Sequence, residues 1–240
     1  MNKKFLIPVV IIIVIAIGGI AYYYLSKNQS ETPQQTSENQ TSGKFEKSVF
    51  FIHHSTGEIY WNGGMEEILT SRGFIAAAPF WEGATDPPDF YGEFTNQSNW
   101  EILESYSVII FKSCFPASDI TSDEMLEEYK GYYNQLYEVY EDHPDKLFVP
   151  MSTPPLLEGS TSLAAAQRSL EFENWLLGEY KDNYSGTNLV PFGLHSLLSD
   201  NNGYLASEFI SEGGDDHPND YSGQVVGEAI WEHLKSYVEG

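Results

Sequence analysis

The sequence is poor in cysteine, since Cys114 is the only one among 240 residues. A single cysteine excludes an internal disulfide, and it also excludes a zinc site built on several thiolates. An isolated cysteine in such a chain is usually a buried small side chain rather than a nucleophile. The sequence therefore offers no cysteine-based redox or metal chemistry.

Basic side chains are scarce as well, with 12 Lys and Arg against 35 Asp and Glu and a formal net charge of −23. After residue 47 the imbalance is greater, with 7 basic and 32 acidic side chains. A surface this acidic repels phosphate backbones, so we expect no nucleic-acid partner. Solubility in an extracellular or salty setting explains the acidity. Hydrophobic residues make up 41% of the chain, which is enough for a folded core.

Charge is absent from residues 5–25, a run of 21 residues that follows Lys3 and Lys4. About 20 apolar residues span a bilayer. We therefore predict an N-terminal membrane anchor over residues 1–25, with the N-terminus cytoplasmic and the rest of the chain extracellular. A cleaved signal peptide is the alternative, although this apolar region is long for one and no small-residue cleavage site follows it. Residues 26–47 are rich in Ser, Thr, Gln and Asn, which predicts a flexible linker before a domain over residues 48–240.

Apolar runs and helical patterns alternate through that domain. Buried strands are expected at 49–52, 74–78, 107–111, 145–151 and 188–192, and helices at 65–72, 122–142, 162–180 and 222–238. The segment 81–100 is expected to be a long loop, and Thr121-x-x-Glu124 matches a capping box. Strands that alternate with helices predict an α/β fold, a three-layer α/β/α sandwich with a mainly parallel five-stranded sheet.

Polar residues with catalytic potential follow the first of these strands and precede the last helix. Ser55 lies in His53-His54-Ser55-Thr56-Gly57, and His217 follows two aspartates, Asp215 and Asp216. A serine hydroxyl becomes a nucleophile when a base removes its proton and a carboxylate orients that base. We predict Ser55 as nucleophile and His217 as base, with either aspartate as the orienting acid. Ser55 as a helix cap and His217 as a hydrogen-bonding loop residue are the structural alternatives.

Three segments together resemble the SGNH (GDSL-like) hydrolases. These are 51–55, where the family has a Gly-Asp-Ser motif, Lys-Ser-Cys-Phe-Pro at 112–116, and Asp-Asp-His-Pro-Asn at 215–219. The chain looks most like a bacterial and archaeal subgroup that carries all three. The resemblance covers about residues 48–240. It implies a flavodoxin-like sheet of the SGNH type, a serine esterase without cofactor or metal, and the roles of nucleophile, base and acid for Ser55, His217 and Asp215.

The chain departs from the family pattern at three points. The family acid stands three residues before the histidine, where this chain has Gly214, and the family oxyanion asparagine falls at Ser113 or Cys114. The family oxyanion glycine has no clear counterpart, and Gly64 and Gly83 are the candidates. The candidate oxyanion or pocket residues are therefore His54, Gly64, Ser113, Cys114 and Asp216.

The sequence favours a membrane-anchored, extracytoplasmic serine ester hydrolase or acyl (acetyl) transferase that acts on acylated carbohydrate or a small ester. Trp61, Trp81 and Trp100 are expected near the site, where they could stack on sugar rings or equally form part of the core. One alternative is a non-catalytic glycan-binding domain on the same fold. Another is a metal-dependent hydrolase, for which the nitrogen and oxygen ligands would be His53, His54, Asp215, Asp216 and His217. The sequence does not predict an oligomeric state.

Overall fold

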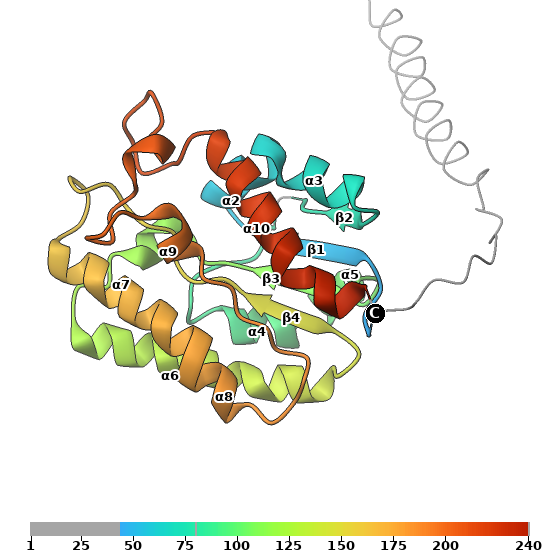
Figure 1. Ribbon diagram of the computed structural model, residues 1–240. Helices are drawn as coiled ribbons and strands as arrows, with labels where there is room; N and C mark the ends of the chain where they lie inside the picture. Colours follow the sequence, from blue (N-terminus) through green and yellow to red (C-terminus); the bar gives the residue numbers. More distant parts are fainter. Residues whose placement is uncertain (1–43, 80, 240) are drawn as a thin grey trace, which may run out of the picture. The chain divides into compact units, whose positions relative to one another are not determined.

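The computed structural model describes residues 44–79 and 81–239 (Figure 1). The predicted anchor at 5–25 and the linker up to residue 43 lie outside the described residues. Among the residues that are described, no helix has the length and apolarity needed to cross a bilayer. The last residues assigned to the linker pack on the domain, because Phe45 is buried and its N–H donates to the Tyr237 carbonyl over 3.1 Å. The packed domain therefore begins before the expected boundary at residue 48.

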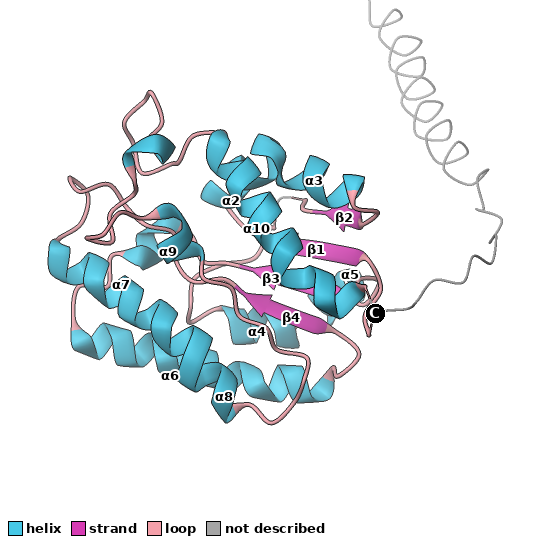
Figure 2. Cartoon of the chain, viewed as in Figure 1, coloured by secondary structure: helices cyan, strands magenta, loops and turns pink. Residues whose placement is uncertain are grey.

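A parallel four-stranded sheet forms the centre of the domain, with strand order β2-β1-β3-β4 (Figure 2). The strands are β1 (Ser48–Ile52), β2 (Ile75–Ala77), β3 (Val108–Phe111) and β4 (Leu147–Pro150). The fifth strand expected at 188–192 is instead a pair of isolated parallel bridges, Phe148 to Leu189 and Met151 to Phe192. Pro191 lies between these bridges and has no N–H for a further neighbour, so this segment ends the sheet.

Helices connect the strands and account for their parallel direction. They are α2 (Thr56–Tyr60), η1 (Trp61–Met65), α3 (Glu66–Ser71), α4 (Phe90–Thr95), α5 (Gln97–Leu103), η2 (Phe115–Ser118), α6 (Asp123–Asp142), α7 (Leu163–Trp175), η3 (Leu176–Tyr180), α8 (Lys181–Asn183), α9 (Leu194–Leu198), η4 (Ser207–Phe209) and α10 (Tyr221–Val238). The helix expected at 65–72 is found as α3 with the residue before it, beyond a kink at Gly64, and α2 stands directly after Ser55. One expectation needs correction, because the expected loop at 81–100 contains α4 and most of α5.

The two faces of the sheet carry separate apolar clusters, because successive side chains of a strand point to opposite faces. Val49 and Phe51 pack with the α2–α3 run and with α10 on one face, whereas Phe50 and Ile52 pack with α4, α6 and η3 on the other. Helices therefore cover both faces, as Figure 1 shows. The structure is the predicted three-layer α/β/α sandwich, with four strands instead of five.

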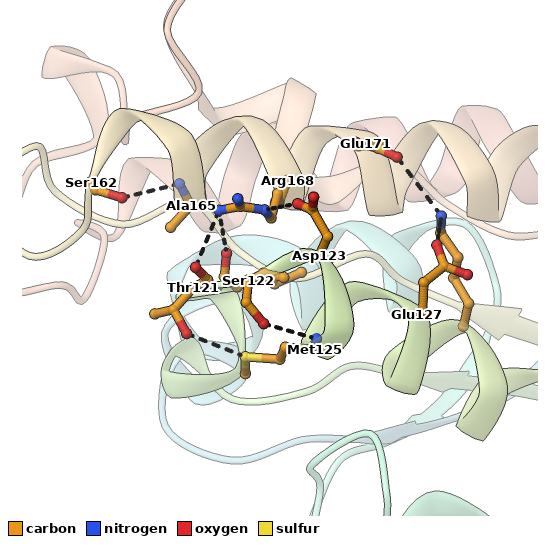
Figure 3. Close-up of polar contacts among 11 residues, drawn as sticks. Thr121, Ser122, Asp123, Met125, Glu127, Ser162, Ala165, Arg168 and Glu171 are labelled. Atoms are coloured by element: carbon orange, nitrogen blue, oxygen red, sulfur yellow. Dashed lines mark hydrogen bonds and ion pairs between the residues drawn. The ribbon is translucent and has the colours of Figure 1, made fainter.

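Helices α6 and α7 lie side by side on the second face. Arg168 of α7 binds the Asp123 carboxylate over 2.6 Å and donates to the Thr121 carbonyl over 3.2 Å (Figure 3). Ser122, rather than Thr121, caps α6, and its hydroxyl accepts from the Met125 N–H over 3.2 Å. The N3 residue is then Met125 rather than Glu or Gln, so α6 has a single serine cap and the expected capping box does not form. Because the ion pair is largely exposed, most of the stabilisation comes from the buried aromatic contacts beneath it.

Helix α10 approaches the α2–η1 run closely enough that only glycine fits at the contact. A Cβ at Gly223 would lie 2.6 Å from the Tyr60 carbonyl oxygen and 2.7 Å from the Gly63 Cα. A Cβ at Gly63 would in turn lie 2.4 Å from the Asp220 carbonyl oxygen. This contact brings the start of α10 against the helical run that follows Ser55.

We expect Gly223→Ala to lower the free energy of unfolding by about 1–3 kcal/mol, because the added methyl group overpacks this contact. Gly131→Ala is the matched control, since Gly131 lies inside α6 and a methyl group added there would meet no atom within 4 Å. That substitution should stabilise the chain by about 0.5–1 kcal/mol. Urea unfolding of both variants measures the difference. Equal effects of the two substitutions would contradict the close-packing argument.

Candidate active site

Ser55 stands at the carboxyl edge of the sheet, directly after β1. In a doubly wound sheet, ligands bind at this edge where the strand order reverses, here between β1 and β3. Ser55 has φ +42° and ψ −99°, and among the described residues it is the only one other than glycine with a positive φ. Its hydroxyl makes no capping hydrogen bond to α2. A strained backbone of this kind is kept where the surrounding structure holds it, as at functional turns.

His217 reaches Ser55 from 162 residues away in the sequence. The His217 Nε2 atom and the Ser55 hydroxyl are hydrogen-bonded. On the other side of the ring, Nδ1 lies 3.4 Å from the Asp215 Oδ2 atom. The Phe115 ring of η2 packs edge-on against the imidazole at a centroid distance of 5.2 Å. The structure thus brings together the three residues predicted as nucleophile, base and acid.

The backbone around His217 is held by the segment before it. Pro218 forms an antiparallel bridge with Ile210, and the Asn219 N–H donates to the Phe209 carbonyl over 2.8 Å. The Asn219 side chain also donates to the Glu208 carbonyl over 2.7 Å. These bonds connect the histidine to η4 on one side and to α10 on the other.

The two neighbouring aspartates have different partners. The Asp215 Oδ1 atom accepts the His217 N–H over 3.0 Å and the Ser211 hydroxyl over 3.3 Å. The backbone bond from His217 and then the imidazole charge hold the pKa of this carboxyl below its usual value. Asp216 points elsewhere and accepts the Leu157 N–H over 3.0 Å. Asp215 is therefore the carboxylate beside the imidazole, and Asp216 ties this loop to the segment after β4.

His53 and His54 diverge from each other and from His217. His54 is half-buried, and its Nε2 atom lies 2.7 Å from the Trp81 carbonyl oxygen. His53 is buried against Phe51, with ring centroids 4.7 Å apart. Within the described ranges no three His, Cys, Asp or Glu side chains are grouped as metal ligands. The proposed metal-ligand set therefore does not converge in this structure.

The carboxyl end of β3 supplies the other buried polar groups of this edge. Ser113 is fully buried, and in the described part of the chain its hydroxyl has no hydrogen-bond partner. Cys114 is half-buried and precedes η2. Gly64 lies nine residues beyond Ser55 in η1, where a Cβ would approach Gln224 of α10, and a Cβ at Gly83 would strike the Glu93 carboxylate. The φ of +140° at Gly64 and the close carboxylate at Gly83 give each glycine a structural reason.

Two of the three tryptophans belong to the core. Trp61 and Trp81 are 7% and 4% exposed, whereas Trp100 is half-buried and lies against the His143 ring at a centroid distance of 3.6 Å. The core expectation therefore holds for Trp61 and Trp81, which are not exposed for stacking on sugar rings. A hollow of about 530 Å³ lies instead beside η2, and its lining residues are Asp86, Pro88, Pro116, Ala117, Met125, Glu128, Tyr129 and Tyr132.

Sequence reasoning missed two features of the site. Lys112, directly after β3, is fully buried. The sequence signal for this burial is the unbroken apolar run Val108–Phe111 before Lys112, which indicates a strand covered on both faces. The second feature is the pair of backbone N–H groups at the start of the helix after Ser55. There the N–H groups of Ser55 and Thr56 make no hydrogen bond with any described residue.

Burial lowers the pKa of His53 from 6.5 to about 4, and the positive charge of Lys112 contributes. Above pH 6.5 the His53 ring is neutral in the folded chain and in the unfolded chain. Between pH 6.5 and 4 the His53 ring is protonated in the unfolded chain but stays neutral in the folded chain. The free energy of unfolding therefore falls as the pH falls. We expect a loss of roughly 2–3 kcal/mol from this residue between pH 7.5 and 4.5.

His53→Phe should remove that part of the pH dependence. Urea unfolding of both proteins at the two pH values gives the measurement, because the difference between the proteins isolates His53 from the other histidines. If the free energies of unfolding of the two proteins differ by the same amount at both pH values, His53 protonates freely in the folded chain.

No protein-family model and no curated protein matches the sequence. Solved structures do match. A proposed acylhydrolase from Bacteroides fragilis aligns with a TM-score of 0.58 at 16% identity, over 89% of this chain and 94% of the other. A proposed lipolytic protein of the G-D-S-L family from Desulfitobacterium hafniense aligns at 0.54 and 15%, over 79% and 100%. A GDSL-like lipase from Bacteroides thetaiotaomicron aligns at 0.50 and 11%, over 89% and 96%. The α/β fold expected from the resemblance to GDSL-like hydrolases is therefore confirmed.

Proposed function

We propose that the chain is a serine hydrolase that cleaves carboxylic esters through an acyl-Ser55 intermediate. The observation that carries this proposal is the connected series Ser55, His217 and Asp215, in which each side chain faces the next. A nucleophile, a base within hydrogen-bond reach and a carboxylate that orients the base are the parts that this chemistry needs.

The geometry supports the following sequence of steps. His217 Nε2 takes the proton of the Ser55 hydroxyl as the oxygen attacks the ester carbonyl. Asp215 holds the ring through Nδ1 and stabilises the imidazolium that forms. When the tetrahedral intermediate collapses, His217 returns the proton to the leaving alcohol and the acyl group stays on Ser55. Water, activated by the same imidazole, then attacks the acyl-serine and releases the acid; an alcohol in place of water gives transfer.

Candidate donors to the oxyanion follow from the backbone at Ser55. The N–H groups of Ser55 and Thr56 have no acceptor among the described residues and begin the helical run, where the peptide dipoles favour negative charge. Such preorganised donors stabilise the charge that develops on the carbonyl oxygen. The buried Ser113 hydroxyl, at the neighbouring strand end, is a third candidate in place of the family asparagine.

The proposed substrate is an acylated carbohydrate or a small neutral ester. The hollow beside η2 supports this choice because tyrosine rings and carboxylates line it, and together they suit a neutral polyol better than an anion. Its residue Pro116 is next to Phe115, which contacts the His217 ring. From the sequence we also propose that residues 5–25 anchor the chain in the cell membrane with the hydrolase domain outside.

A fluorophosphonate probe should label the chain at Ser55, because the probe reacts with a serine whose proton is removed by a neighbouring base. Ser55→Ala should abolish labelling, whereas Ser160→Ala, at an exposed serine in the turn between β4 and α7, should leave it unchanged. Gel fluorescence and mass spectrometry of the labelled peptide give the readout. An unlabelled wild-type chain would contradict the proposal and would favour the non-catalytic glycan-binding alternative.

The different partners of the two aspartates predict different kinetic effects. Asp215→Asn should lower kcat at least about tenfold with little change in KM, because the amide no longer favours the imidazolium. Asp216→Asn keeps an oxygen for the Leu157 N–H and should retain most of the activity. Hydrolysis of p-nitrophenyl acetate measures both variants. A larger loss in Asp216→Asn than in Asp215→Asn would reverse the assignment of the acid.

A further inference from the structure

Lys112 is a fully buried lysine at the edge of the sheet that carries Ser55. Among the described residues, its Nζ atom has no hydrogen-bond partner and forms no ion pair. Among the described lysines one more is buried, Lys146, which is 8% exposed at the opposite edge of the sheet. Its ammonium donates to the Glu104 carbonyl over 2.6 Å and pairs with Asp145 over 3.1 Å. The chain therefore satisfies one buried ammonium group and leaves the other unsatisfied.

The sheet register places Lys112 beside the segment that leads to Ser55. Phe111 pairs with Ile52 across β3 and β1, and the Lys112 N–H donates to the Ile52 carbonyl over 3.3 Å. Lys112 is thus the neighbour of His53, two residues before Ser55. On the same face its Nζ atom lies 6.0 Å from the centre of the Tyr60 ring, which belongs to α2, the helix that starts directly after Ser55.

The titratable and charged groups that interact with this ammonium come from several elements. They are His53 directly after β1, Tyr60 of α2, Cys114 before η2 and Asp86 of the loop before α4. Burial lowers the pKa of Lys112 from 10.5 to about 8, while Asp86 and Cys114 oppose that shift. The group is therefore mostly protonated at neutral pH, in surroundings that contain no neutralising contact partner among the described residues.

Burying an unpaired ammonium group destabilises a fold, and an apolar side chain of the same length would pack in its place without that penalty. A stabilising role therefore does not account for Lys112. A charge in a buried site acts strongly on neighbouring charges, because the local dielectric is low. In ester hydrolysis the new charge is negative and forms on the carbonyl oxygen beside the nucleophile.

We propose that Lys112 supports the hydrolytic site electrostatically: its buried ammonium group keeps a positive charge beneath the turn at Ser55 and stabilises the negative charge that develops on the substrate carbonyl oxygen. Lys112 acts through its field and does not touch the substrate. This inference rests on the proposed esterase function.

The test compares Lys112→Met with Lys146→Met in the full-length chain. Lys112→Met should lower kcat for p-nitrophenyl acetate at least about tenfold, because the field at the oxyanion is lost, with KM nearly unchanged. Its urea midpoint should stay the same or rise, because an unpaired buried charge is removed. Lys146→Met should do the opposite, with kcat unchanged and a lower urea midpoint, because it leaves the Glu104 carbonyl without its donor.

The pH profile provides a second readout that a purely structural lysine would not affect. In the wild type, kcat should fall above about pH 8 as Lys112 loses its proton. The fall should be absent in Lys112→Met. Should that variant not fold, the wild-type profile decides alone, and a kcat that stays level from pH 7 to 9.5 overturns the inference.

The outcomes separate the inference from the proposed function on which it rests. A wild-type chain that hydrolyses esters, together with a Lys112→Met chain of equal kcat and the same alkaline fall, overturns the role of Lys112 alone. A wild-type chain that neither hydrolyses the ester nor reacts with fluorophosphonate overturns the esterase function, and this inference with it.

Discussion

The hydrogen bond between Ser55 and His217 is the contact on which the other parts of the site depend, and two separate packing arrangements hold its partners. Ser55 is fixed by β1 below it and by the helical run that begins at the next residue. His217 is fixed by the bridge of Pro218 and by the start of α10. The glycine contact between α10 and η1 joins these arrangements. A change far from the hydroxyl can therefore separate the two side chains without touching either of them.

Much of this arrangement follows from local sequence patterns. Unbroken apolar runs such as Val49–Ile52 and Val108–Phe111 predict strands covered on both faces, and parallel strands put the residues that follow them at one edge of the sheet. Ser55 and Ser113 are placed at that edge by this rule alone. The meeting of Ser55 with His217 was expected from their residue types and from the resemblance to GDSL-like hydrolases, because no local pattern relates residues 162 positions apart.

The features that sequence reasoning did not find depend on tertiary contacts. Trp61-Asn62-Gly63-Gly64 has the composition of a loop, yet the helix continues to Gly63, and the backbone leaves the helical conformation at Gly64. The absence of a side chain at Gly63 lets α10 approach. Asp215 and Asp216 are chemically identical neighbours, and only the path of the backbone separates the imidazole partner from the Leu157 partner. The burial of Lys112 runs against the strong preference of lysine for the surface. The apolar run Val108–Phe111 before it is the one sequence signal for its burial, whereas the residue type itself indicates the surface.

The electrostatics of the site differ between its exposed and its buried charges. The Asp215 side chain is 66% exposed, so water screens its charge and its main effect is to orient the ring that it contacts. Lys112 lies beside His53 in the sheet register, with its ammonium over the Tyr60 ring and no exposed surface, where screening is weak. In a chain with a net charge of −23, the mean field of the surface opposes the formation of an oxyanion. A buried positive charge near the nucleophile offsets that field locally. An anionic transition state can therefore be stabilised in a domain whose surface is acidic.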